Sequence, residues 1–262
     1  MMDLSSPELS YLVGLLQTDG SHSGSTAGKG KISIELSERD ADILLELQRL
    51  LPCHSLISTR IRDTNFKQGY VSKVLEFCSQ DVRKEFERFG VPTGKKSKIV
   101  GPPAETFSRP DYLRGVLDGD GSIGFTAKGF PFISLVTASP ALAKHFCEEI
   151  AEVCGVRRSA RPNRRDSVPN VMVANLAAAR LACWCYPIGA LSISRKYAAA
   201  RAVAEWQAPH QRFGHTMKRW TPDEDEIISR HSIKEAAALL GRTEQSVNLR
   251  RWRLRGRTAP PE

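Results

Sequence analysis

Two aspartates, Asp19 and Asp120, stand at matching places in a segment that the chain contains twice. Residues 11–21 read YLVGLLQTDGS and residues 112–122 read YLRGVLDGDGS, so seven of the eleven positions are identical at an offset of 101. The apolar pattern of each copy predicts a helix that ends in Asp-Gly. If the two helices pack side by side, both carboxylates lie at negative helix-dipole ends and repel each other unless a cation lies between them.

Mg²⁺ or Mn²⁺ suits such a pair, because these cations bind carboxylate, water and phosphate oxygens. We therefore expect metal-assisted phosphoryl chemistry at Asp19 and Asp120, with Gly20 and Gly121 beside them in the metal site. A single Asp-Gly pair would indicate only the end of a helix and the start of a turn. The duplication of the whole segment favours the metal site.

The two helices must lie close together if they are to bring the carboxylates together. Gly14 and Gly115 fall in the middle of the two predicted helices, where glycine costs about 1 kcal/mol relative to alanine. Close approach of the two backbones would offset that cost. We therefore expect the helices to cross at these two glycines.

The elements around the two segments follow the same order in each half: helix, strand pair, helix, strand pair, helix. The first helix of each half has a start signal, with Ser6 and Ser108 as capping hydroxyls and proline in the first turn. We expect each of these helices to end at Gly20 or Gly121 in the left-handed conformation. Further elements are expected at residues 32–36, 41–51, 55–61, 70–77 and 81–89, and at 132–136, 141–154, 156–161, 168–174 and 176–184.

Residues 12–20 and 113–121 resemble the two nonapeptides of the LAGLIDADG homing endonucleases, in the single-chain form that carries both motifs. The resemblance covers about residues 5–205 and implies an α+β fold of two pseudo-symmetric αββαββα halves whose sheets form a saddle over DNA. It implies divalent-metal cleavage of both strands across the minor groove of a long, near-palindromic site. The family's metal-binding acid directly precedes the final glycine, which makes it Asp19 and Asp120 here, and its other acid position holds Gln17 and Asp118.

A basic residue that steadies the scissile phosphate or activates water is a second requirement of such a site. Lys95 and Lys96 close the first half, and Lys196 closes the second, with Lys95 and Lys196 aligned at the offset of 101. We expect Lys95 or Lys96, together with Lys196, to be the paired active-site lysines. Plain phosphate contact is the alternative role for all three.

The charge of the chain favours a polyanionic partner. The formal net charge is +9, and arginines outnumber lysines by 25 to 13, which suits bidentate contacts to phosphate and guanine. Alternate residues of the strands should face double-stranded DNA, although a solvated basic face is the alternative. The candidate DNA contacts on the two sheets are Arg60, Arg62, Lys67, Lys73, Arg157, Arg158, Arg161, Arg164 and Arg165.

A third, smaller module is predicted at residues 218–257, after a linker at 207–217. Thr221 and Glu224 form a capping box with Pro222 in the first turn, and three short helices around a tight turn resemble a Myb/SANT-type helix-turn-helix. Val247 and Leu254 should face its core, and Trp220 and Trp252 should be buried or half-buried. The candidate DNA contacts are Arg242, Gln245, Asn248, Arg251 and Arg253; a protein-interaction module is the alternative.

These features predict a site-specific double-strand DNA endonuclease, with half-domains at 1–105 and 106–206 in a monomer that mimics a dimer. The alternative is a non-cleaving nucleic-acid binder on the same scaffold, such as an RNA-splicing maturase that binds RNA or a DNA-binding regulator. No apolar run is long enough for a membrane span, and the acidic N-terminal residues do not form a secretory signal. We expect a cytoplasmic, nucleoid-associated protein from a bacterial or phage context.

None of the six cysteines forms a CxxC pair, and Cys183-Trp184-Cys185 has no matching second pair. Both observations argue against a structural zinc site. We expect them to be free thiols.

Overall fold

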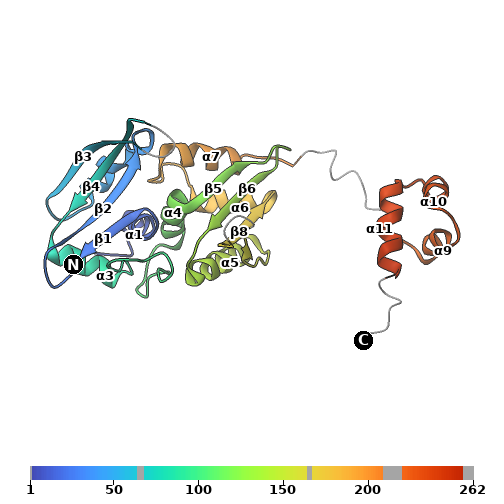
Figure 1. Cartoon of the computed structure of the whole chain (residues 1–262), viewed down its shortest axis with the longest axis horizontal. Helices are drawn as coiled ribbons and strands as arrows, with labels where there is room; N and C mark the ends of the chain where they lie inside the picture. The colour runs from blue at the N-terminus through green and yellow to red at the C-terminus, as the bar shows by residue number, and fades with distance from the viewer. Residues whose placement is uncertain (1, 64–67, 164–166, 209–219, 256–262) are drawn as a thin grey trace. The chain divides into compact units, whose positions relative to one another are not determined.

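The structure of the chain is a computed structural model that describes residues 2–63, 68–163, 167–208 and 220–255. The chain divides into two compact units, Met1–Ala208 and Pro209–Glu262. The boundary falls inside the stretch predicted as a linker. Figure 1 shows the two halves of the first unit, with the paired helices α1 and α4 between their sheets.

The first half follows the predicted order of elements. Its sheet is antiparallel with strand order β1-β2-β4-β3. The elements are α1 (Pro7–Thr18), β1 (Gly20–Gly24), β2 (Gly30–Ser37), the 3-10 turn η1 (Glu38–Asp40), α2 (Ile43–Arg49), β3 (Ser55–Arg62), β4 (Tyr70–Phe77) and α3 (Gln80–Arg88).

The second half repeats this topology, with the antiparallel order β5-β6-β8-β7. Its elements are α4 (Arg109–Asp120), β5 (Gly121–Phe125), β6 (Pro131–Val136), α5 (Pro140–Cys154), β7 (Arg161–Pro162), β8 (Pro169–Ala174), α6 (Leu176–Cys185) and α7 (Ser194–Ala204). The α+β fold with two four-stranded sheets is therefore confirmed for this unit. Helix α7 was not predicted from the sequence.

The strand predicted at 156–161 is wrong for most of its length. Only Arg161 and Pro162 pair with β8, where they oppose Asn170 and Pro169. Proline has no N–H to donate to a ladder. The facing prolines therefore leave this pairing without two of its donors.

The two copies do not stay aligned at one offset. Gly20 pairs with Ile34 and Gly121 with Leu135, which is the offset of 101. Across the next ladder, however, Ile32 pairs with Phe77, whereas its counterpart Ile133 pairs with Val173. The second half is therefore five residues shorter than the first between these two ladder positions.

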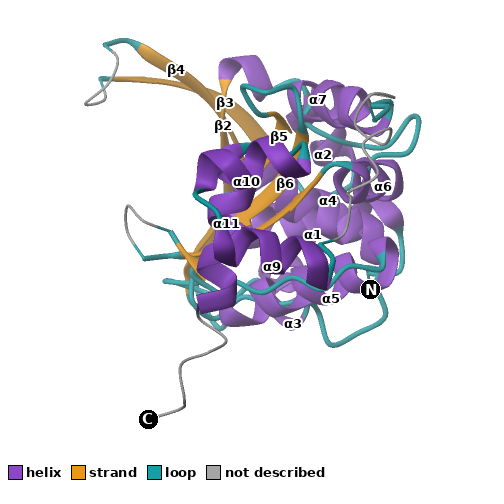
Figure 2. Ribbon diagram, turned by 90° about the vertical axis from the view of Figure 1, so that its right-hand side faces the viewer, coloured by secondary structure: helices purple, strands orange, loops and turns teal. Residues whose placement is uncertain are grey.

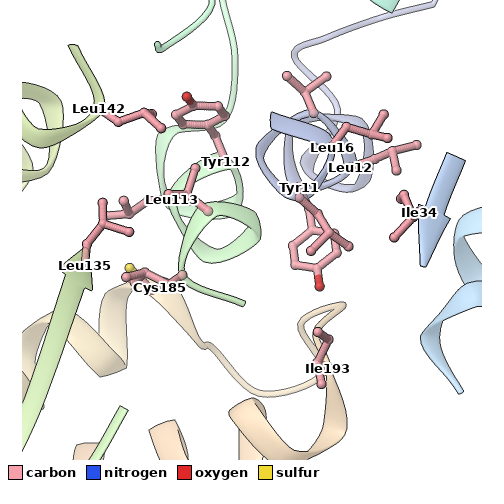
Figure 3. Packing of buried hydrophobic residues seen from close by; sticks show 14 of the residues in the cluster. Tyr11, Leu12, Leu16, Ile34, Tyr112, Leu113, Leu135, Leu142, Cys185 and Ile193 are labelled. Carbon is pink, nitrogen blue, oxygen red and sulfur yellow. The ribbon is translucent and has the colours of Figure 1, made fainter. Parts of the chain in front are cut away.

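Helices α1 and α4 cross where both helices have glycine. A Cβ atom on Gly14 would lie 2.3 Å from the carbonyl oxygen of Tyr112, and one on Gly115 would lie 2.1 Å from that of Tyr11. Both distances are too short for a real Cβ contact with backbone. The two backbones are thus in direct contact, and the leucines and tyrosines around the crossing are fully buried (Figure 3).

The predicted left-handed helix ends at Gly20 and Gly121 are wrong. Asp19 caps α1 with φ −86°, and Gly121 follows α4 in extended conformation with φ −80° and ψ 161°. The strands start at once, packed on the last helical turn. A Cβ on Gly20 would lie 2.5 Å from the Leu16 oxygen, and one on Gly121 would lie 2.6 Å from the Leu117 oxygen. Space, rather than positive φ, requires glycine at both positions.

Each sheet buries one face against the helices and leaves the other face free. On β2, Ile32 and Ile34 are buried at 0% and 1% exposure, while Ser33 and Glu35 alternate with them on the outer face. Figure 2 shows the strands of both sheets on one side of this unit and its helices on the other. The outer faces are therefore open to a ligand.

The second unit contains α9 (Pro222–Arg230), α10 (Ile233–Leu240) and α11 (Glu244–Arg255). Ile228, Ala236 and Val247 form its buried centre, against which Trp220 and Leu254 pack. The predicted Thr221–Glu224 capping box is present, and Ser232 and Glu235 form a second one. Burial of Trp252 was wrongly predicted: its exposure is 71%, because it lies on the face of α11 opposite to Val247.

None of the helices in the described ranges is both long and apolar enough to cross a lipid bilayer. All six cysteines are free thiols.

Candidate active site

The structure brings Asp19 and Asp120 together at the ends of α1 and α4. Gly119 makes this possible, because a Cβ there would lie 2.1 Å from Oγ1 of Thr18 and 3.4 Å from Cγ of Asp19. The last turns of the two helices therefore touch beside the carboxylates. Both aspartate side chains are exposed, so a ligand can reach them.

The electrostatics of the pair suit a cation. Partial desolvation at the packed helix ends and the like charge of Asp120 raise the pKa of Asp19 to about 6, and the same partial desolvation raises the pKa of Asp120. A bound cation would relieve this repulsion. No group of three or more His, Cys, Asp or Glu side chains in the described ranges is arranged to hold a metal. Two carboxylates could still hold a cation such as Mg²⁺ or Mn²⁺, since these ions take their remaining ligands from water and phosphate.

Two buried lysines bind the same helix ends. Lys96, which is 8% exposed, donates from Nζ to the carbonyl oxygens of Gln17 and Thr18, at 2.7 Å each. Lys196, which is 6% exposed, donates to the carbonyl oxygens of Leu117, at 3.1 Å, and Gly121. The last carbonyls of a helix lack partners within it and form its negative end. The ammonium groups satisfy these carbonyls and place positive charge beside the aspartates.

Lys95 is exposed and lies outside this arrangement. The structural counterpart of Lys196 is Lys96, at an offset of 100, rather than Lys95. Burial lowers the pKa of both Lys96 and Lys196, while nearby carboxylates, including Asp19, act in the opposite direction.

The glycines of the predicted metal site have other roles in the structure. The carbonyl of Gly121 accepts the hydrogen bond from Lys196, and Gly20 opposes Ile34 in the β1–β2 ladder. The two aspartates are thus the ligands that the geometry leaves for a metal.

Gln17 and Asp118, the residues at the other acid position, are buried at 1% and 2% exposure. Gln17 donates to the carbonyls of Gly90 and Gly101, and Asp118 accepts hydrogen bonds from four donors. The polar atoms of both side chains are therefore engaged by buried partners. Sequence reasoning missed this network, although the matching tyrosines at 11 and 112 in the two copies were a visible signal.

The outer face of the first sheet carries Arg60 and Arg62. Both are paired with Glu35, at 2.6 and 3.0 Å, so a carboxylate offsets part of their charge. Lys73 lies on the opposite face, because it opposes the buried Leu36 in the ladder. The prediction that these basic residues share one face is therefore wrong for Lys73, and Lys67 lies outside the described residues.

The second sheet presents a different surface. Arg157, Arg158 and Arg161 are exposed and line a cavity of about 380 Å³ together with Asn170 and Met172. Within the described parts of the chain, none of the three arginines has an ion-pair partner. They give this face of the second sheet a positive charge, and Arg164 and Arg165 lie outside the described residues.

Two of the predicted contacts in the second unit are occupied within that unit. Arg242 pairs with Glu224 at 2.9 Å, and its guanidinium lies 3.8 Å from the centre of the Trp220 ring. Arg251 donates to the carbonyls of Ile228, at 2.5 Å, and His231. These two arginines hold the helices together. The other candidates, which remain exposed on α11, are Gln245, Asn248 and Arg253.

Comparison with known families gives one match. Residues 6–90 match the family described as the LAGLIDADG-like domain. None of the curated proteins matches the chain in sequence.

Among solved structures, the fold is similar to that of single-chain LAGLIDADG homing endonucleases. The homing endonuclease I-WcaI bound to its DNA recognition sequence has a TM-score of 0.53 at 11% identity, covering 76% of this chain and 88% of that one. I-SmaMI bound to uncleaved DNA target in the presence of calcium ions has a TM-score of 0.50 at 11% identity, covering 91% of this chain and 99% of that one. At such identities the similarity shows the fold alone.

Proposed function

We propose that the protein is a site-specific DNA endonuclease that hydrolyses both strands with Mg²⁺ or Mn²⁺. The observation that carries the proposal is the meeting of Asp19 and Asp120 at two helix ends that Lys96 and Lys196 also bind. Two acids and two lysines in a pseudo-symmetric pair suit a duplex, whose two strands also run in opposite directions. One chain supplies both halves, so a monomer is sufficient.

Each residue has a distinct role in this proposal. Asp19 and Asp120 hold the metal through their exposed carboxylates. The metal, when bound, lowers the pKa of a water ligand and offsets charge on the phosphate. Lys96 and Lys196 use two of their three N–H donors on helix carbonyls, which fixes their ammonium groups beside the aspartates and the phosphate charge.

The outer faces of the two sheets bind the duplex in this proposal. Arg157, Arg158 and Arg161 attract phosphates of one half-site, and Arg60 and Arg62 bind the other while Glu35 moderates their charge. The helices α9–α11 form a Myb/SANT-like helix-turn-helix that contacts flanking DNA, which extends the recognised site. We also propose the domain limits at residues 105, 206 and 217, and a cytoplasmic location at the nucleoid.

Cleavage of a randomised duplex library with Mg²⁺, followed by sequencing of the products, tests the proposal. We expect defined cleavage sites for the wild-type protein. The Asp19→Asn/Asp120→Asn double variant should bind the recovered site without cutting it. Lys95→Gln should cut normally and Lys96→Gln slowly, because only Lys96 contacts the helix end.

The alternative is a non-cleaving nucleic-acid binder on this scaffold, either a maturase that binds RNA or a DNA-binding regulator. Selection of bound sequences from matched DNA and RNA pools separates the two. Tight, sequence-specific binding with no cut in any recovered site would exclude the endonuclease in favour of this alternative.

A further inference from the structure

The segment that carries Lys96 is held at both ends by one side chain. Gln17, on α1, donates from Nε2 to the carbonyl oxygens of Gly90, at 2.9 Å, and Gly101, at 2.8 Å. Lys96 lies between these two glycines in the sequence and donates a hydrogen bond to the main-chain carbonyl oxygen of Gln17. The position of the lysine therefore depends on the amide of Gln17.

Asp118 holds the corresponding segment in the second half. Its carboxylate accepts hydrogen bonds from the hydroxyl of Ser192 at 2.7 Å, the main-chain N–H of Ile193 at 2.8 Å and the hydroxyl of Tyr186 at 2.8 Å. Ile193 directly precedes α7, the helix that carries Lys196. The start of this helix is thus tied to Asp118.

The chemistry of each segment explains why one half has an amide and the other a carboxylate. The first segment offers carbonyl oxygens at Gly90 and Gly101, which need N–H donors. The second offers N–H and O–H donors at Ile193 and Ser192, which need an acceptor. Glutamine and aspartate match these opposite requirements.

A tyrosine from the opposite motif helix completes each arrangement. Tyr112 of α4 donates its hydroxyl to Oε1 of Gln17 at 2.6 Å, and Tyr11 of α1 donates to Oδ2 of Asp118 at 2.7 Å. Both tyrosines are fully buried. Figure 3 shows the hydroxyl of Tyr11 pointing away from α1 toward the segment at Ile193.

We propose that Gln17 and Asp118 are positioning residues for Lys96 and Lys196, and that each is held by the tyrosine of the other half. The support is therefore crossed. Tyr11, in the first half, supports the lysine of the second half, and Tyr112, in the second half, supports the lysine of the first. The catalytic meaning of this arrangement rests on the proposed endonuclease function. The crossed support itself does not.

Nuclear magnetic resonance of the full chain with ¹³Cε-labelled lysine tests the crossed support without any substrate. Lys96→Arg and Lys196→Arg assign the two buried resonances. Tyr11→Phe should shift the resonance of Lys196 and leave that of Lys96 in place, and Tyr112→Phe should do the reverse. Thermal melting verifies that both variants fold. If Tyr11→Phe does not fold, Ser192→Ala, which also removes a donor to Asp118, tests the link from Asp118 to Lys196 and should shift the Lys196 resonance alone, while Tyr112→Phe tests the crossed support.

Strand-resolved cleavage of a recovered site tests the catalytic consequence. Lys96→Gln and Lys196→Gln first identify the strand that each half cuts. Tyr11→Phe should then slow cutting of the Lys196 strand on the order of tenfold, leaving nicked product, and Tyr112→Phe should slow the Lys96 strand. Equal slowing of both strands, an uncrossed pattern or no change would overturn the proposal. If the wild-type chain cuts nothing but the crossed resonance shifts are present, the endonuclease fails and the crossed support stands.

Discussion

Arg195 of α7 donates hydrogen bonds to both carboxylate oxygens of Asp40, from Nε to Oδ1 at 3.1 Å and from Nη2 to Oδ2 at 2.9 Å. Asp40 lies in η1 of the first half, so this contact joins the two halves directly beside Lys196. Ser194 adds a second contact between the halves by donating its hydroxyl to Asp42. The helix that carries the second lysine is therefore fastened to the first half as well as to its own.

The Asp40→Asn variant should lower the free energy of unfolding by about 1 kcal/mol at pH 7, because an ionic hydrogen bond is lost at a half-exposed arginine. Arg195 lowers the pKa of Asp40 below its ordinary value of 3.8. The stabilisation is thus present above pH 3.8 and is lost as the pH falls through the lower pKa of the folded state. Urea unfolding at pH 7 and pH 3 measures this. Lys144→Gln, in an exposed pair with Glu148, is the control, and equal stability of wild type and Asp40→Asn at pH 7 would contradict the prediction.

The Asp19→Asn variant should melt at a higher temperature than the wild type in EDTA at pH 8. The pKa of Asp19 is raised to about 6, so the folded state holds this proton more tightly than the unfolded chain. Stability from this group is present below about pH 4 and is lost as the pH rises through 6. Calorimetry between pH 4 and 8 should show the two melting temperatures diverging across this interval.

Added Mg²⁺ should stabilise the wild type at pH 8 more than Asp19→Asn, since only the wild type keeps both proposed ligands. Glu38→Gln, an exposed change outside the site, is the matched control and should follow the wild type. If Asp19→Asn melted at the same temperature as the wild type at every pH in EDTA, the two carboxylates would not repel each other.

Gly14→Ala and Gly115→Ala should each destabilise the first unit by about 3 kcal/mol, because the added methyl groups meet the backbone of the facing helix and force α1 and α4 apart. Urea unfolding measures the loss. Gly28→Ala serves as the control, since its Cβ meets nothing within 4 Å. A loss below the roughly 1 kcal/mol typical of point changes would show that the helices separate easily.

Replacing Arg157, Arg158 and Arg161 by glutamine should weaken DNA binding and reduce the slope of log K against log salt by about 2 to 3, with each phosphate contact counting about 0.9. These arginines lack ion pairs within the described residues, so their loss removes charge that faces the ligand. Lys73→Gln, on the buried-side face of the first sheet, should leave the slope unchanged. If Lys73→Gln reduced the slope more than the triple arginine variant did, the DNA would bind a different surface.

The Arg242→Gln variant should unfold the helices α9–α11 more readily, by about 2 kcal/mol, because it removes one of the partners of the buried carboxylate of Glu224. Fluorescence of the half-buried Trp220, which lies against Arg242, reports the transition. The exposed Arg253 should behave differently: Arg253→Gln should lower DNA affinity at unchanged stability. If Arg253→Gln destabilised the helices and Arg242→Gln did not, Arg253 would have the structural role and Arg242 would be the candidate DNA contact.

The sequence predicted the regular elements well where local signals were strong. The capping serine at position 6, whose hydroxyl accepts from the N–H of Leu9 at 3.3 Å, and the alternation of Ile32, Ile34 and Leu36 in β2 located their elements closely. The predictions failed where a contact that the spacing of residue types does not show decided the outcome. Gly20 is required by the oxygen of Leu16, and Arg242 is buried by Trp220, and neither neighbour can be identified from spacing alone.

The candidate site, too, was predicted from the sequence only in part. Repetition alone indicated Asp19, Asp120 and the crossing glycines, because matching residues in two copies are visible in the sequence. It could not distinguish Lys95 from Lys96, since the copies differ in length between the motif and the lysine. The anchoring roles of Gln17 and Asp118 depend on segments more than seventy residues away and became visible only in the fold.

The opposite hydrogen-bonding requirements of the two lysine segments limit how this gene can change. Recombination between its two repeats is a natural route to new specificities, because it exchanges whole recognition surfaces. Here a crossover between the motif and the lysine would join Gln17 to the donors at Ile193 and Ser192, or Asp118 to the carbonyls at Gly90 and Gly101. The second product would bury the carboxylate of Asp118 against carbonyl oxygens that cannot donate to it, so the motif helix of the second half should not replace that of the first.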